Sequence, residues 1–194
     1  MKRLVVGISG ASGVIYGIRL LEVLQSVPEV ETHLVMSTAA AQTIGLETET
    51  SAAEVAALAD VVYRFQDIAA AISSGSFRTM GMVVIPCSMK TLGGIAHSYS
   101  DNLLLRAADV VLKDRRRLVL VPRETPLHLG HLRLMTQLAE MNAIIAPPMP
   151  AFYHRPQTID DIINQTVNRV LDLFHIELRE DLFQRWQGGK RESR

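Results

Sequence analysis

Four short groups of residues in this sequence carry side chains that bind phosphate, and each group follows an apolar run. They are Gly10-Ala11-Ser12, Ser37-Thr38, Ser88-Met89-Lys90-Thr91 and Arg123-Glu124. Hydroxyl groups, lysine and arginine donate hydrogen bonds to phosphate oxygens, and glycine lets backbone N–H groups approach the same oxygens. These residue types therefore predict a site for a phosphorylated ligand.

The segment from Gly7 to Gly13 lies between an apolar run and a helical pattern, so it could present a helix N-terminus to an anion. Its glycines lack the G-x-G-x-x-G spacing of a dinucleotide site. Ser37 also stands where such a site has an acid for the ribose. NAD is therefore disfavoured, and a monophosphate or an FMN-like ligand fits better. An ordinary tight turn is the alternative for this segment.

A cation and a carboxylate adjoin at Arg123-Glu124. At the rim of a pocket the arginine could bind phosphate while the glutamate moves a proton. The alternative is a surface ion pair, which contributes little to stability. Tyr153 follows a proline-rich segment that could hold an aromatic ring over a pocket, and Arg169 lies on a predicted helix. Physical reasoning alone leaves the roles of Tyr153 and Arg169 open.

Other reactive residue types have structural explanations. Cys87 ends an apolar run and is expected to be a buried small hydrophobe. His128 and His131 are three residues apart, a spacing compatible with a metal, but no third ligand is evident. Asp160-Asp161 falls in the first turn of a predicted helix, where carboxylates stabilise the helix dipole. No metal site is therefore expected.

Apolar runs that alternate with helical patterns must position these groups. Strands are expected at 4–8, 33–36, 61–65, 82–85, 117–121 and 143–146, and helices after 13, after 51, and at 102–113, 128–141 and 158–174. This alternation predicts a single α/β domain over residues 1–186, with a doubly wound parallel sheet, helices on both faces and a frayed tail at 187–194. Because ligands bind beyond the carboxyl ends of such strands, the four groups should meet on one rim.

Composition excludes several classes of protein. The chain of 194 residues has 20 basic and 20 acidic side chains, and this balance argues against nucleic acid or an anionic membrane as its partner. Its one cysteine allows no intrachain disulfide, which suits the cytoplasm. No apolar stretch is long enough for a membrane span, and the glycines and serines after Ile8 interrupt any signal-peptide pattern.

Five motifs, taken in order, resemble the flavin prenyltransferase family, whose members were earlier described as aromatic-acid decarboxylases. The resemblance covers about residues 3–186, and its motifs are the segments 10–13, 86–88, 102–110, 118–124 and 152–156. It implies a flavodoxin-like fold. It also implies that the chain joins a dimethylallyl group from dimethylallyl monophosphate to FMN, making prenylated FMN for a separate decarboxylase. Family members form large homo-oligomers, of which a dodecamer is one form, with sites between subunits.

The resemblance also implies roles for individual residues. The FMN-binding positions are Gly10, Ala11, Ser12, Ser37, Ser88, Met89, Lys90, Thr91 and Arg123. The prenyl-phosphate positions are Tyr153 and Arg169, with Arg106, Lys113 and Arg123 adding positive charge and Trp186 lying near the site. Ser12, Glu47 and Glu124 match positions implicated in proton transfer. Glu47 is aligned by spacing alone, so Glu49 is the alternative.

Two other functions are weighed against this one. A cysteine-decarboxylating flavoenzyme of the same superfamily would have a Pro-x-Met-Asn signature, but Pro147-Pro148-Met149-Pro150 has no asparagine. An FMN-binding electron-transfer or storage protein would need no second phosphate-binding cluster. Electron carriers are also usually acidic, whereas this chain is neutral.

Overall fold

Six parallel strands form one sheet in the order β3-β2-β1-β4-β5-β6. The structure is a computed structural model that describes residues 1–188. Without the short edge strand β3, the order is that of flavodoxin-like sheets, so the predicted doubly wound α/β fold is confirmed. The strands are β1 (Lys2–Ile8), β2 (Val30–Met36), β3 (Val61–Tyr63), β4 (Gly81–Cys87), β5 (Arg117–Pro122) and β6 (Ile144–Ile145).

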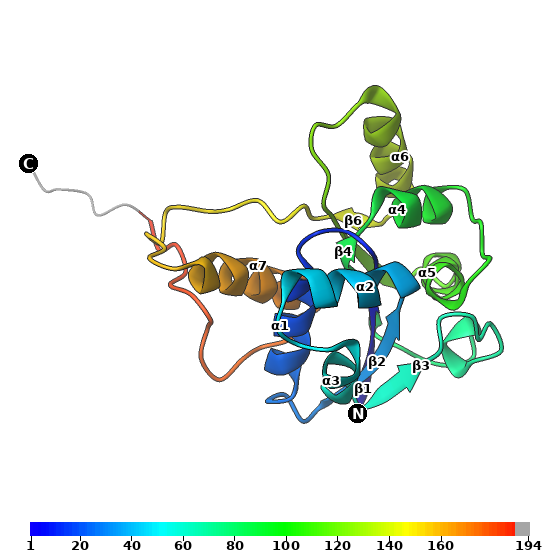
Figure 1. The fold of residues 1–194 in the computed structure, drawn as a ribbon, viewed down its shortest axis with the longest axis horizontal. Helices are drawn as coiled ribbons and strands as arrows, with labels where there is room; N and C mark the ends of the chain where they lie inside the picture. Colours follow the sequence, from blue (N-terminus) through cyan, green and yellow to red (C-terminus); the bar gives the residue numbers. More distant parts are fainter. Residues whose placement is uncertain (189–194) are drawn as a thin grey trace, which may run out of the picture.

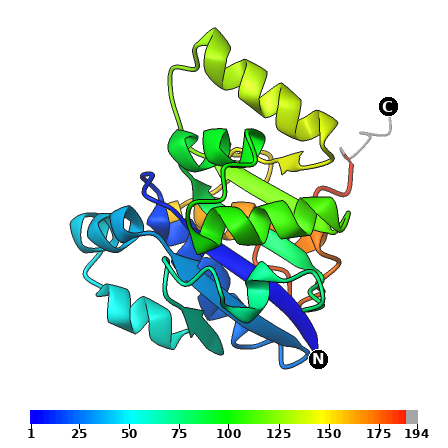
Figure 2. The same cartoon turned by 90° about the vertical axis from the view of Figure 1, so that its right-hand side faces the viewer.

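Helices cover both faces of the sheet, as Figures 1 and 2 show from two sides. Successive residues of β1 belong to opposite faces of the sheet. Leu4 and Val6 pack under α1 and α7, while Val5 packs under α4 and α5. The helices are α1 (Val14–Leu24), α2 (Thr38–Glu47), α3 (Ala52–Ala57), η1 (Ala71–Ser73), α4 (Met89–Ala96), α5 (Leu103–Lys113), α6 (Leu129–Glu140) and α7 (Ile159–Leu173).

Helix α6 stands away from the rest of the domain and touches it mainly through α4 and β6 (Figure 2). Leu138 is its buried residue, whereas Leu129 is 60% exposed and Leu132 is 46% exposed. Apolar side chains are also exposed in the segment before α7, at Met149 and Phe152. Both regions therefore leave apolar surface without cover inside one chain.

Polar caps define the starts of three helices that the sequence predicts. Ser51 with Glu54 and Thr158 with Asp161 form capping boxes at the starts of α3 and α7. Asn102 caps α5 through Leu105 N–H. Each expected strand is present, with ends that differ by a few residues. The expected frayed tail at 187–194 lies mostly outside the described residues.

The strand order reverses between β1 and β4, which are parallel neighbours at the centre of the sheet. The connections from β1 and β4 leave toward opposite faces, so a crevice opens at the carboxyl ends of these two strands. Strand β1 pairs with β2 on one side of the crevice, and β4 pairs with β5 on the other. Four strand ends therefore lie at this edge of the sheet. No helix of the described residues has the length and apolar character needed to cross a membrane.

Candidate active site

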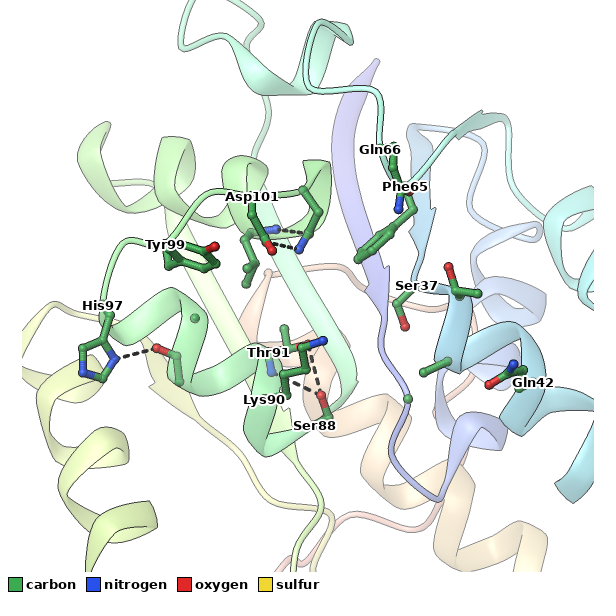
Figure 3. Close-up of a pocket in the computed structure, with 17 residues that line it drawn as sticks. Ser37, Gln42, Phe65, Gln66, Ser88, Lys90, Thr91, His97, Tyr99 and Asp101 are labelled. Carbon is green, nitrogen blue, oxygen red and sulfur yellow. Dashed lines mark hydrogen bonds between the residues drawn. The ribbon is translucent and has the colours of Figure 1, made fainter.

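A cavity of about 910 Å³ opens where β1, β2 and β4 end (Figure 3). It is lined by five of the predicted residues: Gly10, Ser37, Ser88, Lys90 and Thr91. Figure 3 shows Ser37 on one side and Tyr99 on the other, with Ser88 and Thr91 between them. Three of the four predicted strand-end groups therefore contribute to one cavity, whereas Arg123 and Glu124 do not line it.

Gly10 allows helix α2 to pack against the loop after β1. A Cβ atom at position 10 would lie 2.3 Å from the Cβ of Ala39, which is far inside van der Waals contact. Ala39 and Ser37 belong to the first turn of α2 and its cap, and both line the cavity. A side chain at position 10 would therefore displace one wall of the cavity.

Two helices direct their N-termini at the cavity, and a serine caps each of them. Ser37 accepts a hydrogen bond from Ala40 N–H, and Ser88 accepts one from Thr91 N–H. The other N–H groups of a first helical turn have no partner inside the helix, so two such termini favour an anion between them. Ser88 is thus a helix cap, and this cap lies on the rim where phosphate binding is predicted.

Buried Ser9 ties the two central loops together, a role that its position in a Gly/Ser turn does not reveal. Its hydroxyl donates to the Pro86 carbonyl at 3.0 Å and accepts from Ser88 N–H at 2.8 Å. The end of β1 is therefore fixed relative to the start of α4. This connection makes the rim a preorganised surface.

The N-terminus of α1 is occupied by a carboxylate of this chain. Glu47, the last residue of α2, accepts hydrogen bonds from Gly13 N–H at 2.8 Å and Val14 N–H at 3.3 Å. The expectation that this helix end offers free N–H groups to a ligand anion is therefore wrong for Gly13 and Val14, because Glu47 already pairs with both. The N-termini of α2 and α4 remain as the helix ends that could receive an anion. The same contact places Glu47 beside Ser12 in the loop before α1.

Arg123 and Glu124 follow β5, next to the end of β4. The N–H of Arg123 donates to the Cys87 carbonyl at 3.2 Å, and both side chains are exposed. Glu124 accepts a hydrogen bond from Thr125 N–H at 3.0 Å. The structure thus places both residues at the same sheet edge as the cavity, without an ion pair between them among the described residues.

A second pocket, of about 540 Å³, brings together three predicted residues from distant parts of the chain. Tyr153, Arg169 and Trp186 line it together with Phe183 and Arg185. The ring of Tyr153 lies 6.0 Å from that of Trp186 and 6.4 Å from that of Phe183, both edge-to-face. Two guanidinium groups beside three aromatic rings suit a ligand that is part phosphate and part hydrocarbon.

Comparisons with known proteins match nearly the whole chain and its fold. The family model described as Flavoprotein matches residues 1–171. The flavin prenyltransferase UbiX of Escherichia coli K12 is 72% identical over 97% of this chain and 100% of its own. The chain belongs to the flavin prenyltransferase family. It is therefore an enzyme of the transferase class.

Two solved structures of flavin prenyltransferase relatives share the fold closely. One is described as a dodecameric FMN-dependent UbiX-like decarboxylase from Escherichia coli O157:H7. It is 57% identical with a TM-score of 0.93, and the match covers 96% of this chain and 100% of that one. The other, AnUbiX (PadA1), is described as a complex with FMN and dimethylallyl pyrophosphate. It is 50% identical with a TM-score of 0.92, covering 97% and 99% of the two chains.

Arg106 and Lys113, which the family resemblance assigns to the prenyl phosphate, do not join the second pocket within this chain. Both lie on α5, on the face of the sheet opposite to α7 (Figures 1 and 2). Arg106 donates to the Ser73 carbonyl and pairs with Asp109, and Lys113 pairs with Asp114 at 2.8 Å. The prediction that these cations share one site with Tyr153 and Arg169 is therefore not met inside a single copy of this prenyltransferase.

Several residues that line the large cavity were not predicted. They are Gln42, Phe65, Gln66, Gly93, Gly94, His97, Tyr99, Asp101, Asn102 and Leu105. Half of them belong to the connections that precede η1 and α5, outside the five motifs, whereas Asn102 and Leu105 lie in the motif 102–110 without having been assigned to the site. Met89 packs against the core instead of lining the cavity, although its position follows the serine cap. Ala11 and Ser12 lie in the loop beside the cavity and do not line it.

The residues set aside in the sequence analysis take structural roles. Burial raises the pKa of the Cys87 thiol, which is a small buried hydrophobe. His128 caps α6 by accepting a hydrogen bond from Gly130 N–H, and Asp160 pairs with Arg19. Within residues 1–188, no three His, Cys, Asp or Glu side chains are grouped in a way that could hold a metal ion.

Proposed function

We propose that the chain transfers a dimethylallyl group from dimethylallyl monophosphate to N5 and C6 of reduced FMN, making prenylated FMN for a separate decarboxylase. One observation carries the proposal. The rim of the large cavity presents two helix N-termini and Lys90, and a second pocket pairs two arginines with three aromatic rings. A flavin mononucleotide and a prenyl phosphate each need a site with an anion-binding end and an apolar wall. The large cavity and the second pocket each combine these two features.

The residues of the large cavity fit FMN. Its volume of about 910 Å³ lies in the range of cofactor sites, and Phe65 and Leu105 give it apolar walls. Because Gly10 has no side chain, Ala39 and the start of α2 pack against the loop after β1 and form one wall of the cavity. Of the residues proposed to hold FMN, Gly10, Ser37, Ser88, Lys90 and Thr91 line this cavity, and Ala11, Ser12, Met89 and Arg123 lie in the strand-end segments beside it. When bound and reduced, FMN supplies the nucleophilic nitrogen and carbon atoms.

The residues of the second pocket stabilise the departure of phosphate. As the allylic C–O bond breaks, the electron pair leaves with the phosphate, where the Arg169 guanidinium and the Tyr153 hydroxyl can donate to the growing charge. The rings of Phe183 and Trp186 exclude water from the allylic cation and offer it their π faces. Closing the second bond at C6 releases a proton, for which Glu124 is the proposed acceptor. Glu47 and Ser12 are the proposed polar groups of a proton path.

Arg106 and Lys113 add positive charge to the site from a neighbouring copy in this proposal. They lie on the outer side of α5, and neither is near the second pocket of its own chain. A homo-oligomer with sites between subunits would bring the two faces together. The dodecameric description of a relative with 57% identity supports such an assembly.

Mass spectrometry of the flavin tests the proposal directly. Purified chain, reduced FMN and dimethylallyl monophosphate are incubated without oxygen, and the extracted flavin is expected to be heavier by one C5H8 unit. A parallel reaction with dimethylallyl diphosphate shows which phosphate the donor carries, since AnUbiX is described with the pyrophosphate. FMN recovered unmodified from a folded, flavin-loaded protein with both donors would favour an electron-transfer or storage role. Decarboxylation of a cysteine-terminal peptide would favour the related flavoenzymes.

A further inference from the structure

The last described segment of the chain, residues 177–188, is held along α7. Leu178 and Leu182 pack against the core cluster, and Leu182 N–H donates to the buried Asn168 side chain at 2.8 Å. The same segment carries Phe183 and Trp186, which line the second pocket. The position of these two rings therefore depends on how this segment is fixed to the helix.

Arg185 provides that fixation through two carboxylates. Its Nη1 and Nη2 atoms donate to the two oxygens of Asp172 at 2.8 and 2.7 Å, a parallel pair of hydrogen bonds. Its Nε and Nη2 atoms also donate to the two oxygens of Asp181, at 2.5 and 2.6 Å. Asp172 belongs to the last turn of α7 and Asp181 to the segment itself. The guanidinium thus joins the segment to the helix.

The two arginines of the pocket are held very differently. Arg169 makes one ion pair, to Asp172 Oδ2 at 2.8 Å, and its side chain is 56% exposed. An exposed ion pair of this kind contributes little to stability, so Arg169 can exchange the carboxylate for a phosphate at little cost. Arg185 donates four hydrogen bonds in a fixed fork, and its hydrogen bonds to Asp172 are the main reason that the pKa of this carboxyl is lowered.

We propose that Asp172 and Arg185 are positioning residues for prenyl transfer: their bidentate ion pair staples the segment 177–188 to α7 and fixes Phe183 and Trp186 over Tyr153 and Arg169. The inference rests on the proposed function, because it assigns the second pocket to the prenyl phosphate. The proposal gives the two arginines different roles. Arg169 binds the phosphate, and Arg185 keeps the aromatic wall in place.

Tryptophan fluorescence tests the staple without any substrate. Trp186 is the single tryptophan of the chain, so emission, anisotropy and acrylamide quenching all report on this segment. Arg185→Gln and Asp172→Asn are each expected to lower the anisotropy and raise the quenching constant. Arg179→Gln is the matched control, since it removes the same charge from the same segment. Arg179 is exposed and makes no ion pair within residues 1–188.

Kinetics then test whether the staple serves the reaction. In Arg185→Gln, kcat/KM for the prenyl phosphate is expected to fall about 10- to 100-fold, since an ångström of misplacement can cost that much. The dissociation constant for FMN should change less than about twofold, because the segment does not line the cavity assigned to FMN. Arg185→Lys keeps the charge and loses the fork, so it should recover only part of the loss if Arg185 acts by position.

The two assays separate the possible failures. Unchanged Trp186 quenching in both Arg185→Gln and Asp172→Asn would overturn the staple, whatever the activity. A looser Trp186 with an unchanged kcat/KM would overturn its role in the reaction. Full recovery by Arg185→Lys would show that charge alone matters and would equally overturn positioning. If the unsubstituted protein makes no prenylated flavin, the proposed function fails, while the fluorescence result for the staple remains decisive.

Discussion

At the scale of single residues, the structure shows that Glu47 and Glu49 have different surroundings, a difference that the sequence does not reveal. Glu47 ends α2 and points its carboxylate at the first N–H groups of α1, whereas Glu49 is exposed in the following loop. A negative charge at that position favours the positive end of the α1 dipole. The same contact connects α1 to α2, and both elements flank the loop of Gly10 to Ser12. Glu47 therefore stabilises the rim of the site, in addition to any role with protons.

Glu47→Gln is expected to lower the free energy of unfolding by about 0.3–1 kcal/mol, because the amide carries no charge to interact with the helix dipole. Urea unfolding of the flavin-free protein at neutral pH, at one fixed protein concentration, measures this difference. Glu49→Gln removes the same charge two residues away and should change stability by less than about 0.3 kcal/mol. Equal effects of the two substitutions would contradict the capping role.

At the scale of elements, the site depends on how closely α2 approaches the loop after β1. Ala39 lies against Gly10, so this contact sets the distance between Ser37 on α2 and the end of β1. Helix α4 is fixed to the same strand end through Ser9. The distance between the two helix N-termini that face the cavity is therefore fixed by Gly10, which contacts α2, and by buried Ser9, which is hydrogen-bonded to the start of α4.

Gly10→Ala is expected to cost about 1–3 kcal/mol of stability by overpacking and to weaken FMN binding, because α2 must move. Adding Ala39→Gly removes the 2.3 Å clash between Cβ atoms and should restore part of both losses. Gly45→Ala is the control on the same helix: nothing lies within 4 Å of its Cβ position, so it should stabilise α2 by about 0.5–1 kcal/mol. Thermal unfolding and flavin titration measure both quantities. If Gly10→Ala bound FMN normally, the close approach would have no role in the site.

How much the sequence predicts also differs between elements. The strands are recognisable because both faces of the sheet are buried, so runs such as Leu4–Ile8 are apolar throughout. Helix α2 has little signature, since only Ala40 and Ile44 are buried, and α4 contains two glycines. The groups proposed to bind phosphate are local motifs at strand ends, so their position in the fold could be predicted. The pairing of Asp172 with Arg185 and the cavity wall at Tyr99 come from tertiary packing, for which no local pattern exists.

At the scale of the whole molecule, the charges assigned to one reaction are divided between opposite faces. Tyr153 and Arg169 belong to the α7 side, whereas Arg106 and Lys113 belong to the α5 side (Figure 1). A monomer leaves the pocket proposed for the prenyl phosphate open, with Trp186 64% exposed. It also leaves the leucines of α6 uncovered. An assembly that brings the α5 face of one copy to the α7 face of the next would complete the charge of the site and bury apolar surface.

Mixed oligomers test this division. Arg106→Ala and Arg169→Ala are each expected to be nearly inactive alone, because each removes a cation that stabilises the leaving phosphate. Co-expressed in equal amounts with different tags, they should recover roughly one quarter of the unsubstituted activity, since a random closed oligomer then forms that share of complete sites. Arg169→Ala with Tyr153→Phe is the control. Both residues line the pocket of one chain, so no complete site forms and no activity should return. Activity that fails to return with the first pair would mean that each site uses one chain alone.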